Sequence, residues 1–102
     1  MGFGNIMKQA QKMQAKMAQV QEDLKNEELE ASAGGGTVKV QITGDLIVKS
    51  ITIDPSAVDP DDVELLQDMT TAAVNEAIRS AQELQQRRMG EVTGGMNLPG
   101  LM

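Results

Sequence analysis

Three lysines near the start of the chain have the type and spacing needed to bind phosphate groups. Lys8, Lys12 and Lys16 recur at every fourth position, and residues 1–21 contain no acidic residue. On a helix this spacing lines up the side chains on one side, away from the apolar residues, where fixed cations can contact a nucleic-acid backbone. Two interpretations stay open, a nucleic-acid contact and an ordinary solvated helix face.

A second basic group lies in the last third of the chain, at Arg79, Arg87 and Arg88. Arg87 and Arg88 fall near the end of a predicted helix, where positive charge complements the helix dipole without any ligand. Binding to DNA is the other interpretation. Aromatic residues number one Phe with no Trp or Tyr, which disfavours recognition of single strands by base stacking.

Other site chemistry is disfavoured by the composition. The chain has no Cys and no His, so it lacks thiolate ligands, a Cys nucleophile and the commonest general base. The glycines at 34–36 precede a predicted strand instead of the helix that a phosphate loop needs. The acidic residues at 54–64 lack the spacing of a calcium loop, and helix capping explains them. We therefore expect no enzyme activity, no metal, no cofactor and no small-molecule substrate.

Charge is unevenly distributed along the 102 residues, which carry nine Lys+Arg and fifteen Asp+Glu for a net charge of −6. Residues 54–68 hold six of the acids and no base, whereas residues 1–21 are purely basic. The length predicts one domain over residues 1–102. No signal peptide or membrane span is recognisable, so we expect a cytoplasmic protein.

The elements that position these groups begin with a long helix over Gly4–Glu30, with Asn5 as its N-cap. Its apolar residues follow steps of four and three, the heptad pattern of a coiled coil. This pattern predicts a stripe used for the core or for a dimer, made of Ile6, Ala10, Met13, Met17, Val20 and Leu24.

The middle of the chain changes to the two-residue period of strands. Thr37–Thr43 alternates polar and apolar residues, Gly44-Asp45 is the expected turn, and Leu46–Ile53 is a second strand. In that second strand Ile47, Ile51 and Ile53 are expected to share a face with Lys49. Leu29–Ala33, before the glycines, leaves open a third strand, so that the antiparallel sheet would span residues 29–53.

A second helix is predicted over residues 60–89, capped by Asp59, with Pro60 at its first position and Gly90 at its end. Residues 90–102 are expected to form a flexible Gly-rich tail. Its apolar stripe comprises Val63, Leu66, Thr70, Ala73, Ala77, Ala81 and Leu84. So small a sheet cannot cover two helices of about 40 Å, which favours a homodimer whose long helices project.

Several short segments, in this order and spacing, resemble the bacterial nucleoid-associated YbaB/EbfC family; they are Gly4–Gln14, Gly36–Val40, Thr43-Gly44, Ile53–Ser56, Ala73–Ala77 and Gly94–Gly100. The resemblance implies an α+β protomer of order α-β-β-β-α, with the third strand present, in a tweezer-like homodimer. It also implies double-stranded DNA as partner, a place in the nucleoid, and a role in nucleoid organisation and gene regulation. By position, Lys8, Lys12 and Lys16 match the first DNA-holding helix, and Arg79, Arg87 and Arg88 lie on the second.

The acidic balance of the chain departs from what a DNA-binding protein needs. With a sequence pI near 4.5, the chain would bind DNA poorly unless the acidic run 54–68 points away from the duplex. The alternative function is a dimeric scaffold without DNA, in which the Met-rich tail and the helical stripe hold another protein.

Overall fold

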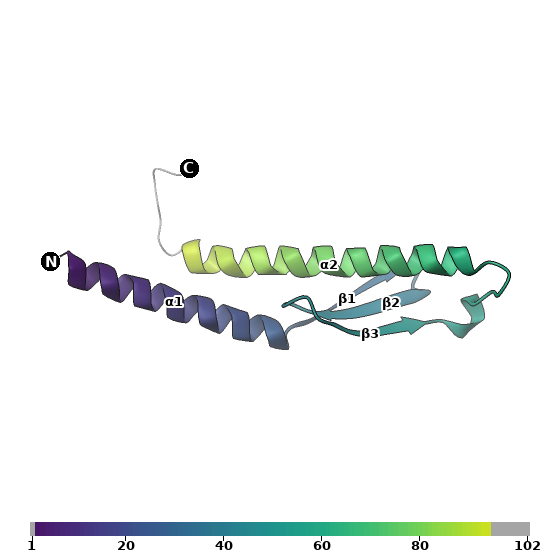
Figure 1. Ribbon diagram of the computed structural model, residues 1–102, viewed down its shortest axis with the longest axis horizontal. Helices are drawn as coiled ribbons and strands as arrows, with labels where there is room; N and C mark the ends of the chain where they lie inside the picture. The colour runs from purple at the N-terminus through teal and green to yellow at the C-terminus, as the bar shows by residue number, and fades with distance from the viewer. Residues whose placement is uncertain (1, 95–102) are drawn as a thin grey trace.

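The computed structural model describes residues 2–94 and has two long helices beside a three-stranded sheet (Figure 1). The elements follow in the order α1 (Phe3–Asn26), β1 (Glu28–Ala33), β2 (Val38–Thr43), β3 (Val48–Ile53), a 3-10 turn η1 (Pro55–Ala57) and α2 (Val63–Gly94). The predicted α+β class and the α-β-β-β-α order are confirmed, including the third strand. Most of the predicted flexible tail, residues 95–102, lies outside the described residues.

The sheet is antiparallel in the order β1-β2-β3, so β2 is central and β3 is an edge strand. Its register sets Ala31 opposite Val40, and Val40 opposite Ile51. The glycines at 34–36 connect β1 to β2 with φ angles of 64°, 68° and 95°. Only glycine adopts this left-handed region without strain, so the glycine run is a strand connection, as predicted.

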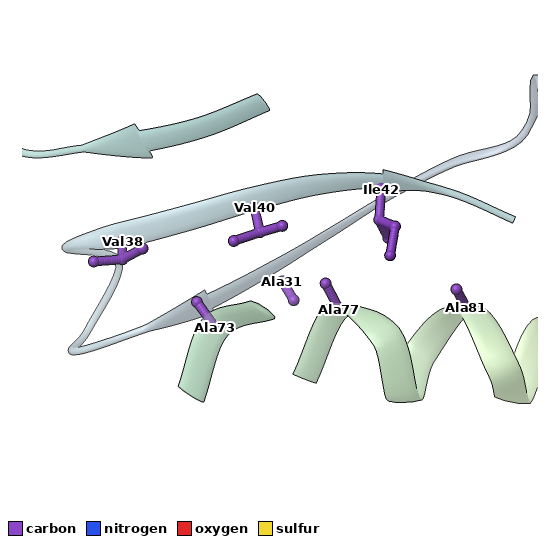
Figure 2. Close-up of a cluster of buried hydrophobic side chains, with 7 residues drawn as sticks. All are labelled: Ala31, Val38, Val40, Ile42, Ala73, Ala77 and Ala81. Carbon is purple, nitrogen blue, oxygen red and sulfur yellow. The ribbon is translucent and has the colours of Figure 1, made fainter. Parts of the chain in front are cut away.

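The core lies between one face of the sheet and α2 (Figure 2). The β2 side chains of Val38, Val40 and Ile42 are fully buried, as the alternating pattern predicts. The α2 side of the core consists of small side chains, all fully buried, at Ala73, Ala77 and Ala81. Methyl groups at this spacing allow the helix backbone to approach β2 closely. Val63, predicted to belong to the same stripe, is instead 50% exposed.

The predicted face of β3 is partly wrong because this strand contains a bulge. Thr52 pairs with Lys39 and Ser50 with Gln41, but the next partner of β2 is Val48, opposite Ile42. The extra residue shifts the alternation of the strand by one position. Val48, in place of Ile47 and Lys49, therefore shares the face of Ile51 and Ile53.

The first helix ends earlier than its composition predicts. It begins at Phe3, with Asn5 inside it, and stops at Asn26 instead of Glu30. Glu27 has an extended backbone with φ −89° and ψ 127°, and β1 starts at the next residue. Residues 28–30 have good helix propensity, but their pairing with β2 overrides it.

The second helix starts and ends later than predicted. The carboxylate of Asp62 accepts from the backbone N–H of Leu65 at 3.3 Å, which makes Asp62 the capping residue. Asp59 instead accepts from the N–H of Asp61 at 2.9 Å and closes the preceding turn. The helix passes through Gly90 to Gly94 because one internal glycine costs only about 1 kcal/mol.

The molecule is a rod with principal extents of 72 × 27 × 16 Å. Its radius of gyration is 19.7 Å, against about 13 Å for a compact chain of this length. The sheet covers one half of α2, and α1 runs beside the other half (Figure 1). The beginning of α1 and the loop between β3 and α2 consequently lie at opposite ends of the rod.

A change at Gly44 tests how tightly the base of α1 packs on the sheet. A Cβ there would lie 2.8 Å from the carbonyl oxygen and from Cδ2 of Leu24. We expect Gly44→Ala to lower the free energy of unfolding by roughly 1–3 kcal/mol through overpacking, measured by urea denaturation at fixed protein concentration. The control is Gly90→Ala, whose Cβ meets nothing within 4 Å; it should raise stability by about 0.5–1 kcal/mol. Equal stability of the Gly44→Ala variant and the unmodified protein would contradict this packing.

Candidate nucleic-acid interface

The lysines predicted to bind phosphate lie on a free-standing part of α1. We call residues 3–23, which precede the buried Leu24, the α1 arm, and Lys8, Lys12 and Lys16 the lysine row. All three lysine side chains are exposed. Within residues 2–94, none of them forms an ion pair. Their charges therefore remain available to a ligand.

The lysine row winds around the arm instead of staying opposite the apolar stripe. A step of four residues turns a helix about 40° beyond a full circle, so the row drifts sideways along the arm. Lys8 lies away from the stripe, but Lys12 and Lys16 line a groove together with stripe residues. The expectation that all three lysines avoid the stripe is thus correct only for Lys8.

That groove lies between the α1 arm and the end of α2 and has a volume of about 530 Å³. Its apolar lining comes from Ile6, Ala10 and Met13 of the arm and from Val92 of α2. The stripe therefore faces α2 of the same protomer. It is 63% exposed at Ile6 and 1% exposed at Leu24, so the arm loses its contacts toward the free end.

Arg79, predicted to bind DNA, already has acidic partners on its own helix. Its guanidinium donates to Glu76 and, at 3.0 Å, to Glu83. The hydrogen bond and the charge of Glu76 raise the pKa of Arg79 above its ordinary value. These i,i+3 and i,i+4 pairs stabilise the helix surface and match the positive charge locally.

The two neighbouring arginines of α2 differ from each other. Arg88 donates two hydrogen bonds to Glu27 and also contacts Glu91 at 3.4 Å. The hydrogen bond to Glu27 raises the pKa of Arg88 above its ordinary value. Arg87 is exposed and forms no ion pair with any residue from 2 to 94. The structure thus groups Arg87 with the lysine row as unmatched charge and separates Arg79 and Arg88 from it.

The acidic run 54–68 lies at the end of the rod far from the α1 arm (Figure 1). Its carboxylates serve local structure, since Asp59 and Asp62 accept from backbone N–H groups. Hydrogen bonds from the hydroxyl and the backbone N–H of Ser56 lower the pKa of Asp54 below its ordinary value. In the described part of the chain, no cluster of potential ligands is suited to a metal ion. No helix between residues 2 and 94 combines the length and hydropathy needed to cross a bilayer.

Two residues that position the arm were missed by the sequence analysis. Val92 was assigned to the tail because Gly90 was expected to end the helix. Had α2 been continued, the four-residue spacing from Leu84 through Arg88 to Val92 would have placed Val92 on the apolar side. Glu27 was assigned to the interior of α1, and no local pattern signals that its partner is 61 residues away.

Comparisons with known proteins agree with this arrangement. A nucleoid-associated protein from Alkaliphilus metalliredigens is 57% identical over 97% of this chain and 87% of its own. Another from Acetivibrio thermocellus is 55% identical over 98% of this chain and 93% of its own.

The fold has also been seen in a crystal. The structure of an uncharacterized protein from Helicobacter pylori superposes with a TM-score of 0.75 at 24% identity, over 85% of this chain and 91% of that one. The model of the YbaB/EbfC DNA-binding family matches residues 1–96. This match spans both helices and the whole sheet, so the resemblance noted in the sequence is confirmed. The chain belongs to the YbaB/EbfC DNA-binding family.

Proposed function

We propose that this chain is a nucleoid-associated protein that binds double-stranded DNA as a homodimer, through phosphate contacts from its α1 arms. The observation that carries the proposal is the lysine row, three exposed cations without an ion-pair partner in residues 2–94. Each cation bound to a phosphate releases counterions, and this release drives binding whatever the base sequence. Nucleoid organisation and gene regulation in the cytoplasm are the proposed roles.

The chemistry of the arm fits a duplex backbone better than a single strand. Single-strand binding relies on aromatic platforms, and the chain has one aromatic residue, Phe3. The side chains around the lysine row are Gln, Ala and Met, and nothing in them specifies a base. We therefore propose phosphate clamping without base readout, with Arg87 as a supporting contact.

Family membership and charge separation both support this function. The family is described as DNA-binding, and relatives more than half identical to this chain are named nucleoid-associated proteins. The acidic run lies at the far end of a rod 72 Å long. Because the Debye length is about 8 Å at physiological salt, these acids scarcely affect a duplex held at the arm.

For the homodimer we propose the uncovered face of β3 as the contact surface. Ile51 lies opposite Val40 in the register, so both side chains are on the core face of the sheet. The helix α2 packs on β1 and β2, and it leaves Ile51 45% and Val48 41% exposed. A second copy would bury this continuation of the core and would present two lysine rows to one duplex.

Charge reversal of the lysine row tests the DNA-binding proposal. We expect Lys8→Glu, Lys12→Glu and Lys16→Glu together to abolish gel retardation of duplex DNA, because phosphates would meet carboxylates. Circular dichroism and sedimentation should show an unchanged fold and mass. For the unmodified dimer with six phosphate contacts, affinity should fall on the order of a thousandfold between 50 and 200 mM salt.

The matched control neutralises three lysines elsewhere, at Lys25, Lys39 and Lys49. Changing each of these to Gln alters the net charge by as much as changing the lysine row to Gln. The lysine-row variant should lose about 0.9 of salt slope for each lost phosphate contact, and the control should lose none. Equal losses in the two variants would place the DNA site elsewhere. No binding of the unmodified protein at low salt would favour the scaffold function.

Placing a charge on β3 tests the proposed dimer surface. Ile51→Lys should give a folded monomer in sedimentation equilibrium, because a half-exposed position tolerates lysine in the protomer but not inside an apolar interface. The control Ile6→Lys places the same charge on the 63% exposed end of the α1 stripe and should leave the dimer intact. A dimer that survives Ile51→Lys and dissociates with Ile6→Lys would assign the interface to the stripe.

A further inference from the structure

One side of α2 carries three residues that meet the α1 side of the molecule at successive points. Gln85, Arg88 and Val92 are spaced by three and four residues, so they share one side of the helix. Gln85 Nε2 donates to the carbonyl oxygen of Gly44 at 2.8 Å. Arg88 binds Glu27, where α1 ends, and Val92 lines the groove beside the arm.

The connection between α1 and the sheet is a single residue, Glu27, between Asn26 of the helix and Glu28 of β1. Its backbone N–H donates to the carbonyl of Asp23 at 3.1 Å, and its own carbonyl accepts from the N–H of Gly44 at 2.9 Å. The backbone at the base of the arm is thus held on both sides. The side chain of Glu27 remains free to bind a group outside the sheet.

The side chains of Glu27 and Arg88 form a two-pronged contact. Arg88 Nε donates to one carboxylate oxygen at 3.2 Å, and Nη2 donates to the other. Both side chains are about two-thirds covered, at 34% and 32% exposure. Among residues 2–94, this is the one ion pair that joins separate elements of the fold; the others lie within a single helix. Paired forks of this kind fix orientation as well as distance.

We propose that Arg88 is a positioning residue: through Glu27 it fixes the direction of the α1 arm relative to α2. Its consequence for DNA rests on the proposed function, but the fixed direction does not. The guanidinium that sequence reasoning assigned to DNA already binds two acids, Glu27 and Glu91. Arg88 acts on the duplex by aiming the lysine row.

The length of the arm makes its direction important. The 24 residues of α1 span about 36 Å. A rotation of about 10° at the base would move the free end by roughly 6 Å, more than the reach of a hydrogen bond. An arm without the pair would sample several directions, and the fraction of molecules competent to bind would fall.

The first experiment measures the arm without DNA. The chain has no Cys, so spin labels on Gln14→Cys and Gln82→Cys, both exposed, report one arm-to-α2 distance in dimers diluted with unlabelled protein. We expect a narrow distribution that broadens or shifts in Arg88→Ala and in Glu27→Gln. The exchange Arg88→Glu with Glu27→Arg should restore the narrow distribution. Distributions in Arg88→Ala and Glu27→Gln that match the unmodified protein would overturn the proposal.

The matched control is Glu91→Gln, which removes the same charge from the same arginine without joining two elements. It should leave the distance distribution unchanged. Broadening in Glu91→Gln equal to that in Glu27→Gln would show that charge alone, and not the link between elements, controls the arm. Thermal unfolding of each variant identifies any that has lost its fold.

The second experiment measures duplex binding and separates aiming from direct contact. If Arg88 aims the arm, Glu27→Gln should weaken binding by roughly three- to tenfold with an unchanged salt slope. If Arg88 instead contacts phosphate, freeing it in Glu27→Gln should strengthen binding, and Arg88→Ala should lower the salt slope by about 0.9. Absence of DNA binding by the unmodified protein would refute the proposed function and leave the distance test of the arm intact.

Discussion

The difference in length between α2 and the sheet is the constraint on which the rest of this molecule depends. Each strand has six residues and spans about 20 Å, whereas the 32 residues of α2 span about 48 Å. The sheet therefore covers less than half of the helix. The uncovered part of α2 has only α1 beside it, so both the groove and the free lysine row follow from this overhang (Figure 1).

The small side chains of α2 determine how the covered half is packed. Ala73, Ala77 and Ala81 bring the helix backbone close to the valines and isoleucine of β2 (Figure 2). A helix that approaches so closely with only methyl groups covers a narrow strip, which here is β1 and β2. The edge strand β3 keeps the same apolar face but has no helix over it. The proposed dimer surface is thus a direct result of the alanine spacing.

Much of this fold could be predicted from the sequence because the signals are local. The alternation at Val38, Val40 and Ile42 gives the buried face of β2, and the spacing of the alanines gives the buried side of α2. The lysine row is visible in the same way, and its exposure follows from the helix that carries it. Each of these needs only a period and a residue type.

The errors arose where pairing across the chain decides the outcome. The end of α1 at Asn26 depends on β1 joining β2, and the bulge near Lys49 depends on the register with Gln41. The role of Arg88 depends on Glu27, which no sequence period connects to it. A basic residue near a helix end looks the same in the sequence whether it meets a phosphate or an acid of its own chain.

The rod shape has a consequence for how the protein behaves on dilution. The chain exposes 7387 Å², whereas a compact monomer of this mass would expose about 5,600 Å². A protomer with so much uncovered surface gains part of its stability from whatever covers that surface. If a second copy does so, folding and association become one equilibrium, and the melting temperature rises with the logarithm of protein concentration.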